Sequence, residues 1–267
     1  MLAKTWELLS PFAVFGSGAA IGILGGLIGL GGAEFRLPLL IGLFGFGALE
    51  AVILNKAMSL IVVAAALPFR AGAVPFSSVL SHGDVVLTLL SGSLAGAWFG
   101  ADWATRLQSR ILYRVIAVLL VGIAAALLWG HDMESGSSAR LGGMALALAG
   151  ALAGFGIGMV AAVLGVAGGE LLIPTLVLLF GLDLKLAGSL SLAVSLPTMA
   201  TSFTRYSRHR SFAVIGAQRR FIALMALGSL AGAWLGGLLL GVVPTAWLLP
   251  VLAAILVLSA VKVWRHG

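Results

Sequence analysis

Long apolar runs constrain this sequence more than any other feature. Three of the longest are Val115–Trp129, Leu141–Val166 and Leu248–Val263. Charged residues make up only 9% of the chain, whereas an ordinary soluble domain carries about 25%. Most of the surface must therefore face lipid, and the runs lack the period of two that marks the strands of an outer-membrane barrel. Because helices also satisfy backbone polar groups in lipid, the sequence predicts an all-α polytopic membrane protein.

Two motifs recur at one constant spacing. Residues 29–38 read GLGGAEFRLP, and residues 165–174, which begin 136 positions later, read GVAGGELLIP. The same spacing separates residues 92–100 (GSLAGAWFG) from residues 228–236 (GSLAGAWLG). Two motifs in one register indicate an internal duplication. We therefore predict two transmembrane repeats, 1–130 and 131–267, that together form one transport domain.

Each half contains five apolar segments, and the second of them is short. The segments lie at roughly 9–28, 34–46, 50–69, 84–104 and 111–129, and at roughly 141–164, 170–181, 186–204, 221–240 and 246–264. About 20 residues are needed to cross the hydrocarbon core, and a Gly cluster precedes each short segment. We interpret the first two segments of each half as a re-entrant or broken helical hairpin, followed by three spanning helices. A fully spanning pair is the alternative.

The basic residues predict which segments face the cytoplasm. Arginines gather in 101–114 and 205–220, and Lys262 and Arg265 lie near the C-terminus. We expect these segments and both termini to be cytoplasmic. The third apolar segment then ends outside in the first half and inside in the second, so the two repeats are inverted. Inverted repeats are typical of secondary transporters, whose substrate site lies near the midplane between the halves.

The Gly clusters and the polar residues of the third segments are candidates for substrate binding. A broken helix leaves free N–H groups and a positive dipole end, which favour an anion; tight packing through small residues is the alternative explanation. Asn55 and Lys56 have Ser191 and Leu192 as counterparts, so only one half supplies a cation at this position. The predicted substrate-binding residues are Gly29, Gly31, Gly32, Asn55, Lys56, Ser59, Gly165, Gly168, Gly169, Ser191 and Ser195.

Glu34 and Glu170 occupy equivalent positions directly after the two Gly clusters. A carboxyl group at membrane depth is costly and is therefore a functional candidate. We predict that both residues couple protons to transport. The alternatives are that each caps its short helix, or that Glu34 pairs with Lys56 and only holds the fold. Arg36 is expected to snorkel or to pair with Glu34.

Motifs for catalysis or for cofactor binding are missing from the sequence. There is no cysteine, and the four histidines show no metal-ligand spacing. G-x-S-x-G, H-E-x-x-H and P-loop motifs are also absent. We therefore expect no catalytic residue, no metal, no cofactor and no nucleic-acid partner, and a protein that is not an enzyme. The expected partners are a small anion and the lipid bilayer; homo-oligomerisation stays open. The rival function is a non-transporting membrane assembly or accessory protein with a dry, packed centre.

The two Gly-rich turns, each followed by a proline and an Ala-x-x-x-Asn/Ser stretch (Ala51–Asn55 and Ala187–Ser191), resemble the sulfite exporter TauE/SafE family. The resemblance covers nearly the whole chain. It implies a bacterial inner-membrane permease for a small anion of sulfur metabolism, such as sulfite or an organosulfonate. It also implies transport driven by an ion gradient, for which the paired glutamates suggest protons.

Overall fold

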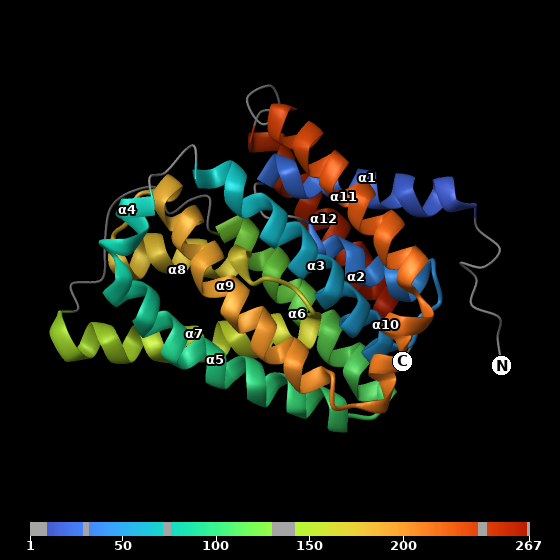
Figure 1. The fold of residues 1–267 in the computed structure, drawn as a ribbon, viewed down its shortest axis with the longest axis horizontal. Coiled ribbons are helices and arrows are strands. Elements are labelled where there is room, and N and C mark those ends of the chain that lie inside the picture. The colour runs from blue at the N-terminus through green and yellow to red at the C-terminus, as the bar shows by residue number, and fades with distance from the viewer. Residues whose placement is uncertain (1–9, 29–31, 72–75, 130–141, 240–244, 266–267) are drawn as a thin grey trace.

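The computed structural model describes residues 10–28, 32–71, 76–129, 142–239 and 245–265. The regular elements of these residues are all helical and stack into one bundle (Figure 1). In the first half they are α1 (Pro11–Ile28), α2 (Ala33–Gly42), α3 (Ala48–Ala71), α4 (Phe76–Leu80), α5 (Gly83–Arg106) and α6 (Ser109–Trp129). In the second half they are α7 (Gly143–Leu164), α8 (Gly169–Phe180), α9 (Leu184–Tyr206), the 3-10 turn η2 (Arg210–Phe212), α10 (Ala213–Ala217), α11 (Arg219–Leu239) and α12 (Thr245–Trp264).

Several of these helices are suited to cross a membrane. Within the described residues, four are long and apolar enough by themselves: α3, α5, α7 and α9. A fifth span results if residues 210–217 and 219–236, which meet at an angle of 71°, are taken as one. The predicted all-α polytopic membrane fold is therefore confirmed.

The duplication seen in the motifs is repeated in the helix boundaries. Helices α2, α3, α5 and α6 begin at residues 33, 48, 83 and 109, and α8, α9, α11 and α12 begin at residues 169, 184, 219 and 245. Each start is thus 136 residues from its counterpart, as for the motifs. The predicted boundary between the repeats, at residues 130 and 131, lies outside the described residues.

The close contact between α5 and α7 recurs at equivalent positions between α11 and α1. A Cβ atom added at Gly96 of α5 would stand well inside 3.0 Å of the carbonyl oxygen of Phe155 in α7. One added at Gly232 of α11, the counterpart of Gly96, would meet the carbonyl oxygen of Ala19 in α1 in the same way. Ala19 is the counterpart of Phe155, so α5 packs on α7 as α11 packs on α1 (Figure 1). Contacts that exchange the halves in this manner are those of a two-fold relation between the repeats.

The equivalent helices α6 and α12 pack against each other in opposite directions. The Arg114 guanidinium, near the start of α6, lies 5.5 Å from the centroid of the Trp264 ring, at the end of α12. The start of one helix therefore lies beside the end of its counterpart. This antiparallel packing supports the predicted inversion of the repeats.

Helices α7 and α8 form a hairpin around a buried Gly turn. Gly165 and Gly168 have φ of 69° and 82°, a left-handed conformation that glycine adopts readily. Helix α8 then returns along α7, because a Cβ atom added at Gly150 would stand 2.7 Å from the ring tip of Phe180. Residues 165–168 are all buried, which supports a turn inside the bundle. In the first half Gly32, with φ of 69°, begins α2 in the same conformation.

Candidate functional site

Asn55 joins the Gly turns of the two halves. It lies on α3 and is completely buried. Its side-chain amide donates to the carbonyl oxygen of Ala33 at 2.9 Å and to that of Leu164 at 3.1 Å. Ala33 begins the short helix of the first half, and Leu164 ends the long hairpin helix of the second. One amide group therefore holds the two turns together in the interior of the protein, as a site between the halves requires.

Lys56 fastens the Gly turn of the second half to α3. Its Nζ atom donates to the carbonyl oxygens of Ala161 and Val166, both at 2.8 Å. A cation is favourable there because the last carbonyls of a helix carry the negative end of its dipole. The alternative of a Lys56–Glu34 ion pair is wrong, because no hydrogen-bond partner reaches the Glu34 carboxylate. Two of the three ammonium hydrogens are thus used on backbone, and one remains for a ligand.

The other predicted substrate-binding residues lie on both sides of this junction. Ser59 is buried one turn after Asn55, and its hydroxyl lies 3.5 Å from the carbonyl oxygen of Gly165. Ser195 is buried on α9, whereas the hydroxyl of Ser191 bonds within that helix, to Gly188 at 2.8 Å. Gly168 and Gly169 form the start of α8, as Gly32 precedes that of α2. Gly29 and Gly31 lie outside the described residues.

The two equivalent glutamates meet at these helix starts. Glu34 is 1% exposed and Glu170 is 5% exposed. Their carboxyl groups lie close enough for their charges to interact. Among the described residues, no hydrogen-bond donor reaches any of the four oxygens. Two buried carboxylates in such proximity repel each other, and protonation of one of them relieves the repulsion.

Arg36 is a site residue that the sequence reasoning misjudged. It does not snorkel, because its side chain is completely buried. It also makes no ion-pair contact with Glu34, since residues two apart on a helix do not face each other. None of its three guanidinium nitrogens has a hydrogen-bond partner in the described structure. The sequence signal was the asymmetry at this position, where the second half has Leu172.

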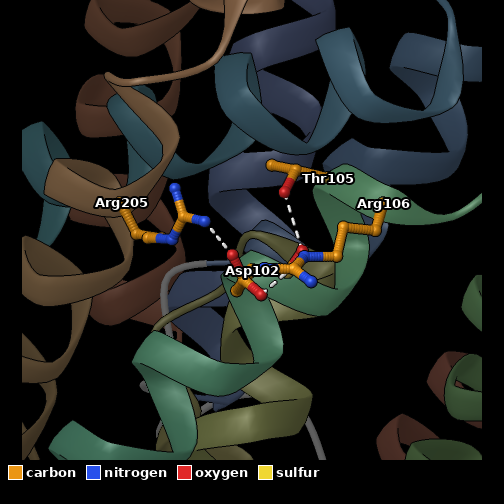
Figure 2. Close-up of polar contacts among 4 residues, drawn as sticks. All are labelled: Asp102, Thr105, Arg106 and Arg205. Atoms are coloured by element: carbon orange, nitrogen blue, oxygen red, sulfur yellow. Dashed lines mark hydrogen bonds and ion pairs between the residues drawn. The ribbon is translucent and has the colours of Figure 1, made fainter.

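The predicted cytoplasmic segments 101–114 and 205–220 meet at one end of the bundle. Asp102, near the end of α5, lies between two arginines (Figure 2). Its carboxylate pairs with Arg106 at 2.8 Å and with Arg205, at the end of α9. The two basic segments therefore lie at the same end of the molecule, as the predicted sidedness requires.

The apolar helices and the polar residues buried among them define a polytopic α-helical membrane protein with a polar centre. The family model described as sulfite exporter TauE/SafE matches residues 3–127. Among curated proteins and solved structures, nothing matches the chain. The resemblance to the TauE/SafE family is thus confirmed over residues 3–127.

Proposed function

We propose that the protein is a secondary-active permease of the bacterial inner membrane, built from two inverted repeats, that carries a small sulfur-containing anion together with protons. Sulfite and sulfonates are the proposed substrates, in line with the family match. The observation that carries the proposal is the meeting of Glu34 and Glu170. They come from different halves, are buried, and lie close enough for their charges to interact.

The position of this pair suits alternating access. When one half of an inverted-repeat transporter rocks against the other, the site between them opens to one side or the other. Such a movement separates two carboxyl groups that belong to different halves and brings them into contact with water. A proton shared by the pair in the closed state can then be released or taken up on one side at a time.

The backbone around the pair suits an anion. The starts of α2 and α8 carry Glu34 and Glu170, so two positive helix-dipole ends converge there. Lys56 and Asn55 lie at the adjoining turn, with Ser59 next to it. Asn55 and Ser59 already donate to backbone carbonyl oxygens. The third N–H of Lys56 and the N–H groups at the two helix starts are therefore the donors available to an oxyanion that enters between the hairpins.

The rival function, an assembly or accessory protein, requires a locked centre with Glu34 bound to Lys56. The ammonium group of Lys56 binds backbone carbonyls instead. Glu34 is left in a pair that can change its protonation, which favours a transport cycle over a purely structural role.

Reconstitution into proteoliposomes tests the proposal. Sulfite and methanesulfonate fluxes are measured with an imposed pH gradient, and net anion movement toward the alkaline side is expected because anion and proton travel together. Glu34→Gln and Glu170→Gln should each abolish the response to the gradient. Asp84→Asn, which changes an exposed carboxylate at the start of α5, is the matched control and should transport normally. Anion flux no greater than in protein-free liposomes would refute the permease, and normal gradient response in both glutamine variants would refute the coupling.

A further inference from the structure

A completely buried guanidinium without hydrogen bonds is unusual enough to require an explanation. Buried polar groups are nearly always hydrogen-bonded, and a buried charge is costly unless it is paired. Arg36 is 0% exposed, and its Nε, Nη1 and Nη2 atoms have no partner in the described structure. It also lies on α2, the ten-residue helix that begins at the junction of the two halves. The five N–H donors of the Arg36 guanidinium thus have no acceptor, and they lie on the helix that also carries Glu34.

The charged groups around Arg36 do not satisfy it. Glu34, on its own helix, makes no hydrogen bond with it. The helices that pack on α2 are α1, α3 and α12. Three of the side chains that the structure describes on these helices are charged: Lys56 is bound to carbonyl oxygens, Glu50 lies near the start of α3, and Lys262 lies against Gly42 at the end of α2. Two of these three are cations, which repel rather than neutralise a guanidinium.

We propose that Arg36 binds the transported anion. This inference rests on the proposed permease function. A guanidinium presents a planar fork of N–H groups that matches two oxygens of one oxyanion, and sulfite and sulfonates each carry three oxygens. Lys56 has one N–H left and is a weaker candidate for the same task.

The proposal also explains how proton and anion are linked. With Arg36 and Lys56 charged and one proton shared by Glu34 and Glu170, the buried groups have one positive charge in excess. A monovalent anion, such as hydrogen sulfite or a sulfonate, neutralises it. When both carboxyl groups are ionised the four groups are neutral, and an anion would bring an uncompensated negative charge into the interior. Binding of the anion therefore requires uptake of about one proton.

The first test measures sulfite and methanesulfonate binding to the purified full-length chain by titration calorimetry. Arg36→Leu copies the residue found at the equivalent position 172, so the fold has a precedent for it. Because removal of one member of a buried, hydrogen-bonded charge pair costs at least about 2 kcal/mol, its affinity should fall about thirtyfold or more. Arg36→Lys keeps the positive charge but not the planar fork of N–H groups. Its affinity should therefore lie between those of the wild type and Arg36→Leu. Arg219→Leu, an exposed arginine at the start of α11, is the control and should bind normally.

The second test uses the wild-type chain, so that it does not depend on the folding of variants. A structure with bound selenite, an electron-dense analogue of sulfite, should place the oxyanion within hydrogen-bonding distance of the Arg36 guanidinium. A pH indicator in weak buffer should report uptake of about one proton per bound anion in the wild type and markedly less in Glu34→Gln.

The outcomes separate this inference from the permease itself. Full-strength binding by folded Arg36→Leu, or selenite bound away from Arg36, would overturn the role of Arg36 even if wild-type liposomes transport sulfite. Selenite at Arg36 together with the loss of binding in Arg36→Leu would support it even if the liposomes show no net flux, in which case the permease proposal fails instead.

Discussion

The contact between α5 and α7 gives the sharpest stability prediction. Gly96 lies against backbone, because an added Cβ atom would fall well inside 3.0 Å of the carbonyl oxygen of Phe155 and 2.9 Å from its Cα atom. Backbone atoms cannot swing aside as the end of a flexible side chain can. Gly96→Ala therefore has to push α5 and α7 apart until this Cβ reaches an ordinary contact of at least 3.4 Å. The required separation is on the order of 1 Å, which forfeits a quarter to a half of the dispersion attraction of each affected atom pair.

The expected cost follows from two opposing effects. Overpacking costs about 1–3 kcal/mol, and packing of small residues is a main source of helix association in lipid. Alanine in a helix interior recovers about 0.5–1 kcal/mol relative to glycine. We expect Gly96→Ala to lower the free energy of unfolding by about 1 kcal/mol, the difference between these two effects. Gly232→Ala, at the equivalent contact with Ala19, should cost the same, and the two losses should add because the sites lie in different interfaces.

Reversible unfolding in mixed detergent micelles, followed by far-ultraviolet circular dichroism, measures this effect. The matched control is Gly122→Ala in α6, where an added Cβ atom meets no heavy atom within 4 Å. The control should be neutral or stabilised by about 0.5–1 kcal/mol. If Gly96→Ala and Gly122→Ala have the same stability, the close approach of α5 and α7 is not what holds these helices together.

Three further substitutions test other parts of the structure by the same unfolding measurement. Tyr206→Phe removes the 2.9 Å hydrogen bond to the Ala162 carbonyl and should cost about 1 kcal/mol; an unchanged stability would show that this bond does not support the end of α7. Asn55→Ala removes the amide that joins the two turns and should cost about 2–3 kcal/mol, because two buried carbonyl groups lose their donor. Asp102→Asn weakens the pairing with Arg205 and should cost at most about 1 kcal/mol, because the pair is partly exposed, with a smaller loss at high salt; a loss independent of salt would contradict an electrostatic role.

Much of the fold can be predicted from the sequence, because each helix boundary in one half can be checked against its counterpart in the other half. The 136-residue spacing that relates Gly96 to Gly232 also relates the starts of four pairs of helices, α2 and α8, α3 and α9, α5 and α11, and α6 and α12. The shortness of α2 and α8 is predicted correctly from the length of the apolar segments. Small residues at four-residue spacing indicate close helix packing, and the structure adds only which helix is the partner.

The hydrogen bonds and the burial of individual side chains in the candidate site could not be predicted from the sequence. Lys56 binds carbonyl oxygens 105 and 110 residues away in the chain, and no local pattern predicts a partner at that separation. The burial of Arg36 depends on the rotation of a ten-residue helix against its neighbours, which packing decides. Hydropathy alone favours snorkelling for an arginine near a segment end, and tertiary packing overrides that preference here.

The charges of the candidate site belong unequally to the two halves. Glu34 and Glu170 are equivalent and lie close to each other, and two carboxyl groups tolerate such closeness when one shared proton removes their repulsion. Arg36 and Lys56, in contrast, have leucine at the equivalent positions 172 and 192. Leu172 packs in a different apolar cluster from the residues next to Arg36 on α2. Both cations of the site therefore come from the first half, and an anion that binds them is held by that half whichever way the second half moves.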